Sequence, residues 1–384
     1  MASNPNPRRR PPPASPQSPS TLDPDLLLTT TNFARPNDQV QDVSPSLLKR
    51  FPFNISVVGA SLLLGATASF AQPSPASASG KVQGYVTTSD GVRLYYEKVG
   101  SGSQIVILPG RLFLFPAFQR LAPGRTLISY DMRDRGRSDA VSDPKRITIQ
   151  HDVNDLETIR QYFHADKPAL IGFSYLGMMV MLYATQHPDR VSRIVQLGPV
   201  SRKFGEQFPA SLTANDPSPV PDPAQLQELE KLMNSGYMRE HPKEFCEREW
   251  QVTRVQLVGN PANAEKLGPS QCDMPNEWPA HLYPHFEASI SSIQALDIPQ
   301  DKIAALRAPV LTIHGTKDRN APYGGGRQWS MSVADGRLIT VPGAAHESWV
   351  EAPDLVFTSI DTFLKGSWPT SAEKVVTLEY NPAR

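Results

Sequence analysis

The sequence has no excess of charge of either sign. It contains 38 basic and 38 acidic residues among 384, which gives a formal net charge of +0. A chain without a basic stripe lacks the electrostatic footprint of a nucleic-acid-binding protein, and it has no single-sign field to steer a highly charged partner. We therefore predict a small-molecule substrate and no nucleic-acid partner.

Cysteine is scarce, because Cys246 and Cys272 are the only two residues of this type. Both lie in the segment 201–298. An even count in an exported protein allows a disulfide, but two free buried thiols are equally compatible with the sequence. Both states remain open.

Patterns for binding a metal or a cofactor are missing. His281 and His285 have a helix-like spacing, but Pro284 interrupts it and no acid lies between them to act as a base. The glycine run 324–326 lacks the Lys-Ser/Thr of a phosphate loop. We predict no metal and no cofactor, and we interpret the two histidines as structural or pocket-lining.

No apolar run is long and uniform enough for a good membrane span. The run 51–68 is interrupted by four small or polar residues, Asn54, Ser56, Gly59 and Ser61. It follows Lys49 and Arg50 and precedes the small residues of "SFAQ", and this order is typical of a secretory signal. The sequence thus predicts export, to a periplasm or outside the cell, with targeting to an organelle as the alternative.

Proline is abundant, with 38 in the chain and ten in the first 50 residues. Residues 1–46 have no apolar period, so they cannot bury enough surface to offset chain entropy. We assign residues 1–71 to a disordered Pro/Ser-rich leader plus the export signal, and residues 72–80 to a linker.

From Lys81 onward, short apolar runs alternate with helical segments. A hairpin around Ser89–Gly91 is followed by "QIVILPG", "RTLISYDMR", "PALIGFS", "RIVQLGPV", "PVLTIHGTKD" and "RLITVPGAAH". This pattern predicts an α/β fold with a mostly parallel sheet flanked by helices on both faces. The predicted parts are a core at 81–200 and 299–366, a helical lid insert at 201–298, and a loosely packed C-terminal extension at 367–384.

The segment "GFSYLG" is close to the turn G-x-S-x-G, which presents a nucleophilic serine between a strand and a helix. Such a turn holds the serine in a strained backbone conformation at the strand end. Gly172 satisfies the first glycine of the pattern. Leu176 takes the place of the second, and Gly177 arrives one residue late. Serine is also a favoured helix N-cap, so a structural role for Ser174 is the alternative.

Two partners for a serine nucleophile follow later strands. A serine hydroxyl needs an imidazole as general base and a carboxylate to orient that imidazole. Asp318 follows "VLTIHG" and His346 follows "RLITVPG", whereas no acid follows "RIVQLGPV". The alternatives are a turn or cap residue for Asp318 and a surface histidine for His346.

The segment "DMRDRGRSD" matches the pattern D-x-R-G-x-G-x-S, with Asp134 in place of the first glycine. Together with "GFSYLG", "GTKDRNAP" and "GAAHESWVEAP", it makes the chain resemble the α/β-hydrolase superfamily from about Lys81 to Gly366. The resemblance implies a catalytic triad with Ser174 as nucleophile, His346 as general base and then acid, and Asp318 as orienting acid.

The resemblance also implies an oxyanion hole made of two backbone N–H groups. One belongs to Tyr175 and the other to the loop after "QIVIL". The family usually has His-Gly in that loop, whereas this chain has Pro109 and Gly110. We expect the N–H of Arg111 as the donor, with Leu112 as second choice. The alternative for Arg111 is a salt-bridged surface residue.

The insert and the surroundings of "GFSY" are most similar to the proline-iminopeptidase-like branch and to lid-bearing esterases. The residues expected to line an apolar pocket are Phe113, Phe115, Trp278, Tyr283 and Phe286. We therefore expect a serine hydrolase that cleaves a carboxylic ester of a small or apolar substrate through an acyl-enzyme.

Two other functions remain open. An aminopeptidase or amidase would use the insert acids Glu247, Glu249 and Glu277 to hold a free amine, but the chain lacks the family's His-Gly-Gly-Pro-Gly segment. A non-catalytic binding protein on a hydrolase fold is the other alternative. The departures at Pro109, Asp134 and Leu176 favour that alternative, and the intact Ser-Asp-His set opposes it.

Overall fold

The computed structural model of the protein describes residues 80–209, 212, 219–268 and 270–380. All the described residues belong to the compact unit Phe51–Arg384. The predicted leader and export signal lie outside the described residues. No helix in the described ranges combines the length and the apolar character that crossing a membrane requires.

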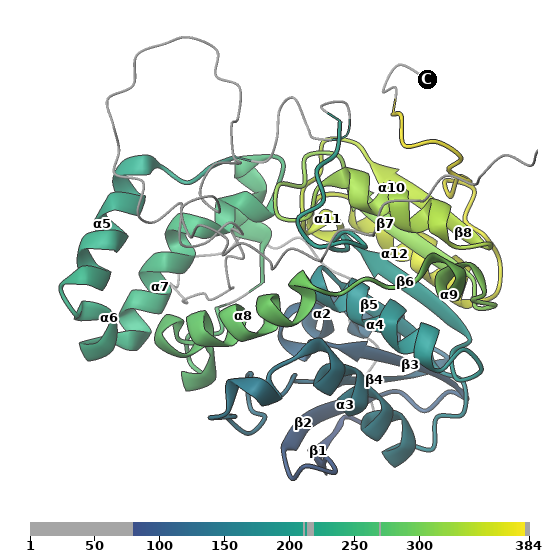
Figure 1. The fold of residues 1–384 in the computed structure, drawn as a ribbon, viewed down its shortest axis with the longest axis horizontal. Coiled ribbons are helices and arrows are strands. Elements are labelled where there is room, and N and C mark those ends of the chain that lie inside the picture. Colours follow the sequence, from purple (N-terminus) through teal and green to yellow (C-terminus); the bar gives the residue numbers. More distant parts are fainter. Residues whose placement is uncertain (1–79, 210–211, 213–218, 269, 381–384) are drawn as a thin grey trace, which may run out of the picture. The chain divides into compact units, whose positions relative to one another are not determined.

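One eight-stranded sheet forms the centre of the described part of the chain (Figure 1). The strands are β1 (Val82–Thr87), β2 (Arg93–Val99), β3 (Gln104–Pro109), β4 (Arg125–Tyr130), β5 (Ala169–Phe173), β6 (Arg193–Leu197), β7 (Val310–Gly315) and β8 (Gly336–Val341). Their order is β1-β2-β4-β3-β5-β6-β7-β8, with β2 antiparallel to both of its neighbours and all other pairs parallel. The predicted fold class is confirmed.

Helices cover both faces of the sheet. They are α2 (Arg111–Phe118), α3 (Ile149–Tyr162), α4 (Tyr175–Gln186), α9 (Gln300–Ala304), α10 (Tyr323–Ser332), α11 (Ser348–Glu351) and α12 (Pro353–Leu364). In β3, Ile107 packs into the core beside α3 and α4, whereas Val106 and Leu108 pack into the core beside α2 and α12. Successive side chains of a strand point to opposite faces. Both faces are therefore buried, which explains the uninterrupted apolar runs.

The helical insert lies between β6 and β7. It contains α5 (Pro223–Asn234), α6 (Tyr237–Glu240), α7 (Pro242–Thr253), the 3₁₀ turn η7 (Pro275–Glu277) and α8 (Pro279–Gln294). Figure 1 shows α5, α6 and α7 gathered beside one another, with α8 running from them toward the sheet, where it contacts α3. A disulfide joins Cys246 of α7 to Cys272, with their Cα atoms 5.8 Å apart, so the structure adopts the bridged state of the two that the sequence allowed.

The C-terminal extension packs more firmly than expected. Glu373 forms an antiparallel bridge with Leu338 of β8, and Val375 is buried. The guanidinium of Arg327 donates to the carbonyl oxygens of Thr377 and Glu379, at 2.9 and 2.8 Å. The prediction of a loosely packed extension is corrected, because backbone hydrogen bonds and apolar burial both hold the segment on the core.

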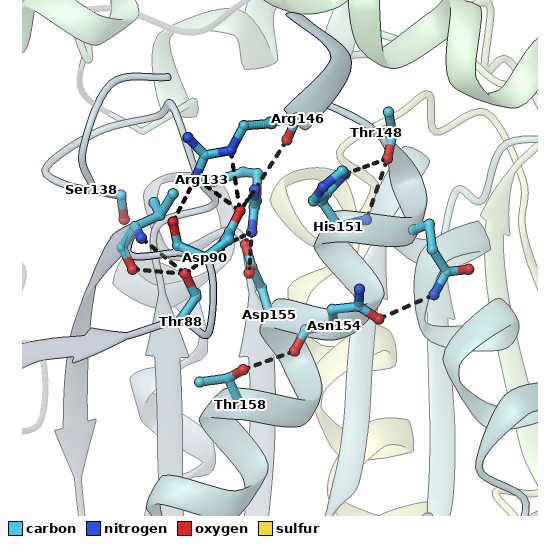
Figure 2. A network of polar contacts seen from close by, with 12 residues as sticks. Thr88, Asp90, Arg133, Ser138, Arg146, Thr148, His151, Asn154, Asp155 and Thr158 are labelled. Atoms are coloured by element: carbon cyan, nitrogen blue, oxygen red, sulfur yellow. Dashed lines mark hydrogen bonds and ion pairs between the residues drawn. The ribbon is translucent and has the colours of Figure 1, made fainter. Parts of the chain in front are cut away.

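A network of ion pairs centred on the buried Arg133 fixes the loop after β4. Arg133 donates to both carboxylate oxygens of Asp155 in α3, at 2.8 and 2.6 Å, and to Asp90 of the β1–β2 turn at 3.0 Å (Figure 2). Asp90 also accepts a hydrogen bond from Arg146 at 2.9 Å. Buried charges are tolerated when each has a well-placed partner. The network thereby joins the loop after β4 to the hairpin and to α3.

Candidate active site

Ser174 occupies the turn between β5 and α4. Its φ of 54° and ψ of −124° lie in a region that residues other than glycine seldom adopt. The turn is held by two hydrogen bonds, from Ser174 N–H to the Leu197 carbonyl at 2.9 Å and from Gly177 N–H to the Ser174 carbonyl at 2.9 Å. These bonds secure the strained conformation, and Ser174 lines a cavity at the end of β5.

Glycines on either side of Ser174 make this turn sterically possible. A Cβ at Gly172 would lie 2.3 Å from the carbonyl oxygen of Leu176, and one at Gly177 would lie 2.9 Å from Pro199 Cβ. Gly177, one residue after the usual position of the second glycine, therefore leaves room for the start of α4 to lie close to Pro199. The Leu176 side chain instead fills space over Gly110, where an added Cβ would lie 2.4 Å from Leu176 Cδ1.

Asp318 and His346 come together from the loops after β7 and β8. His346 Nδ1 lies 2.8 Å from Asp318 Oδ2, and Asp318 Oδ1 accepts hydrogen bonds from the N–H groups of Asn320 and Ala321, both at 2.9 Å. Burial alone would raise the pKa of Asp318, but the contacts with His346 and His314 hold that pKa well below its ordinary range. The carboxylate is therefore ionised and able to orient the imidazole of His346.

His314 is a partner of Asp318 that the sequence interpretation missed. His314 is fully buried, and its Nε2 lies 3.1 Å from Asp318 Oδ2 and 2.8 Å from the Ala321 carbonyl oxygen. Since both neighbours are acceptors, Nε2 carries the proton. The available signal was its position at the end of β7, four residues before Asp318.

Gly198 leaves room for the Asp318–His346 pair. It follows β6 with a φ of 45°, and an added Cβ would lie 3.0 Å from Asp318 Oδ2 and 3.2 Å from His346 Nδ1. The loop after β6 has no acid. Its Gly198 instead leaves room for Asp318, which follows the neighbouring strand β7.

Ser174 and His346 line the same cavity, which has a volume of about 110 Å³. Its walls are mainly apolar and include Phe113, Phe173, Leu176, Val200, Leu257 and Phe286. The polar lining residues that the sequence interpretation missed are Arg135, Asp152, Ser289, Asn320 and Glu347. Asn320 and Glu347 had one usable signal, since they lie two residues after Asp318 and directly after His346.

Three of the five predicted aromatic lining residues lie elsewhere. Phe113 and Phe286 line the cavity, whereas Phe115 is buried in the core beside α2 and α12. Trp278 Nε1 donates to the Cys272 carbonyl at 2.8 Å, and Tyr283 donates to Glu249 within the insert. Trp278 and Tyr283 therefore contribute to the packing of the insert and not to the cavity wall.

The insert acids do not face the cavity. Glu277 is buried and accepts from Arg135 at 3.0 and 2.7 Å and from the Gly136 N–H at 2.7 Å. Glu247 lines a separate groove between α5 and α7. With Glu249 bound to Tyr283, none of the three acids proposed for amine binding lines the cavity.

The two predicted oxyanion donors lie at helix N-termini. Tyr175 begins α4 and Arg111 begins α2, and no hydrogen bond within the described residues uses either backbone N–H. Helix N-termini favour developing negative charge. The Arg111 side chain is salt-bridged to Asp131 at 2.8 Å, and burial raises the pKa of Asp131 to about 6 despite this partner.

His281 and His285 tie the insert to the loop after β4. Asp134 has a φ of 64°, the left-handed conformation that the glycine of the family pattern would adopt easily. Its Oδ1 lies 3.0 Å from His281 Nε2, and its Oδ2 lies 2.9 Å from His285 Nδ1. The substitution of aspartate for glycine thus has a structural role at the base of α8.

A serine in a strained turn after β5, with an Asp–His pair after β7 and β8 of this sheet, is the arrangement of a hydrolase of the α/β class. The pattern of the alpha/beta hydrolase fold family matches residues 106–353, and the chain belongs to this family.

Distant relatives include enzymes of two types. A proline iminopeptidase from Lactobacillus helveticus is 24% identical over 296 residues, which cover 69% of this chain and 91% of that protein. A bifunctional esterase/perhydrolase from Acinetobacter calcoaceticus is 23% identical over 279 residues, covering 68% and 92%. Among solved structures, a serine hydrolase from the polyaromatic hydrocarbon-degrading bacterium Cycloclasticus zankles has a TM-score of 0.55 at 15% identity, covering 75% of this chain and 99% of that one.

Proposed function

We propose that the protein is a serine hydrolase that cleaves carboxylic esters through an acyl-enzyme. One observation carries this proposal: strained Ser174 and the imidazole of the His346–Asp318 pair face a single, mainly apolar cavity. A cavity of this kind suits a small or apolar ester.

Each group has a role in the proposed mechanism. Because Asp318 holds Nδ1 of His346, the other ring nitrogen is available to take the proton of the Ser174 hydroxyl as it attacks the ester carbonyl. The N–H groups of Tyr175 and Arg111 would stabilise the oxyanion. His346 then protonates the departing alcohol and activates the water that releases the acid.

An ester is favoured over a peptide with a free amino terminus. Recognition of an ammonium group requires an available carboxylate, and the insert acids Glu249 and Glu277 are bound to other protein groups. Similarity to a proline iminopeptidase at 24% identity supports the shared fold and leaves aminopeptidase activity as the second candidate.

Labelling with a fluorophosphonate probe tests the proposed nucleophile. We expect wild-type protein to be labelled at neutral pH and Ser174→Ala to stay unlabelled while folded. The wild type should also release p-nitrophenol from p-nitrophenyl butyrate faster than p-nitroaniline from proline p-nitroanilide. Faster cleavage of the anilide would favour the aminopeptidase, and an unlabelled wild type would favour a non-catalytic binding protein.

A further inference from the structure

Two polar side chains in the cavity wall have no part in the mechanism above. Glu347 is 6% exposed and lines the cavity, and its carboxyl makes no hydrogen bond or ion pair with any other described residue. Asn320 is 7% exposed and lines the same cavity, and its Nδ2 makes no hydrogen bond with another described residue, while its Oδ1 is buried without a partner among them. Both belong to the loops that carry Asp318 and His346.

Buried polar side chains without hydrogen-bond partners destabilise the folded protein. A buried polar group without a partner loses its hydration and gains nothing in return. The surrounding wall offers little compensation, because it is built mainly of side chains such as Phe173, Leu257 and Phe286. A bound molecule is therefore the natural source of the missing hydrogen bonds.

The other charged groups of the cavity wall are already engaged. The guanidinium of Arg135 is paired with Glu277, and Asp152 accepts from the Tyr175 hydroxyl at 2.7 Å. Burial raises the pKa of Glu347 to about 8, so that its carboxyl is neutral at neutral pH. A neutral carboxyl is better suited to a neutral hydrogen-bonding partner than to an ammonium ion.

We propose that Glu347 and Asn320 form a polar subsite that binds a hydroxyl group on the substrate of the proposed esterase. A neutral carboxyl both donates and accepts hydrogen bonds, as a hydroxyl does, and an amide adds a second donor and acceptor. The preferred substrate class is thus a hydroxylated ester, and a plain alkyl ester leaves the subsite unsatisfied. This inference rests on the proposed function.

Matched pairs of esters test the subsite. In the acyl pair, p-nitrophenyl 3-hydroxybutyrate is compared with p-nitrophenyl 3-methylbutyrate. In the alcohol pair, 2-hydroxypropyl butyrate is compared with isobutyl butyrate. Each pair replaces a methyl group by a hydroxyl group. We expect the hydroxylated member of one pair to have a kcat/KM about tenfold higher at pH 7, which corresponds to one net hydrogen bond.

Variants of Glu347 distinguish substrate recognition through a hydrogen bond from recognition through a negative charge. Glu347→Gln keeps a neutral donor and acceptor and should retain the preference, whereas Glu347→Leu should abolish it and improve turnover of the alkyl ester. Glu287→Leu, which removes an exposed acid of α8, is the matched control and should behave as wild type.

The results that would contradict the proposed subsite differ from those that would contradict the proposed esterase activity. Equal rates within both pairs, or the same preference in Glu347→Leu, would overturn it. So would a larger kcat/KM for p-nitrophenyl 3-aminobutyrate, which would indicate an ammonium site. If the wild type hydrolyses no ester, thermal stabilisation of Ser174→Ala by the two acyl-pair esters still tests the subsite. Equal stabilisation would then refute it independently of catalysis.

Discussion

Gly198 and Gly124 both adopt the left-handed backbone conformation, with φ of 45° and 76°. They differ in their surroundings, because an added Cβ at Gly198 would lie 3.0 Å from Asp318 Oδ2, whereas one at Gly124 would meet no atom within 4 Å. The two positions therefore separate the effect of backbone strain from the effect of displacing the Asp318–His346 pair.

We expect Gly198→Ala to lower kcat for p-nitrophenyl butyrate by about 100-fold, since small displacements of catalytic groups have effects of this size. Gly124→Ala should cost about 1–2 kcal/mol of backbone strain and leave kcat unchanged. Steady-state kinetics and thermal unfolding of both variants provide the measurement. Equal kcat values for the two variants would show that Gly198 does not position the pair.

At the scale of elements, the insert is joined to the core by buried polar contacts. Arg135 and Gly136 of the loop after β4 bind Glu277, while Asp134 binds His281 and His285. Both side chains of the Arg135–Glu277 pair are almost completely buried. Removal of one partner leaves an uncompensated buried charge, whereas removal of both does not.

Glu277→Leu should therefore lower the free energy of unfolding by about 3 kcal/mol, and the double variant Arg135→Met/Glu277→Leu should recover most of that loss. Urea titration of the wild type, both single variants and the double variant gives the coupling between the two sites. Additive losses in the double variant would contradict the assignment of this pair as the junction between insert and core.

The strands and the candidate triad were predictable because their signals are local. Buried strands such as β5 and β7 appear as unbroken apolar runs. Ser174 directly follows β5, Asp318 lies three residues after the end of β7, and His346 lies five residues after the end of β8. The junction of insert and core was not predictable, because Arg135 and Glu277 are 142 positions apart in sequence. Their pairing depends on how the insert packs against the loop after β4, and no local sequence pattern predicts that packing.

At the scale of the whole molecule, the disulfide bears on where the protein is found. Disulfides form and persist in oxidising compartments. The Cys246–Cys272 bridge therefore supports the proposal that the chain is exported after cleavage near Ala71, with targeting to an organelle as the alternative.

Expression of the full chain in a secreting host tests this proposal. We expect the secreted form to begin shortly after Ala71 by N-terminal sequencing, and to show no free thiol until reduction exposes two. Reduction should lower the free energy of unfolding by roughly 3 kcal/mol, as for a loop of this size. Retention of an uncleaved chain with two reactive thiols would contradict export.

The contact between Leu176 and Gly110 links two loops that are distant in sequence. With leucine at position 176, a Cβ at position 110 would lie 2.4 Å from Leu176 Cδ1, so the leucine would have to change its rotamer to admit a side chain there. The effects of substitutions at the two positions should therefore not add: shortening residue 176 should lower the cost of a larger residue at 110. The left-handed φ of 78° at Gly110 adds a backbone strain that no change at position 176 relieves.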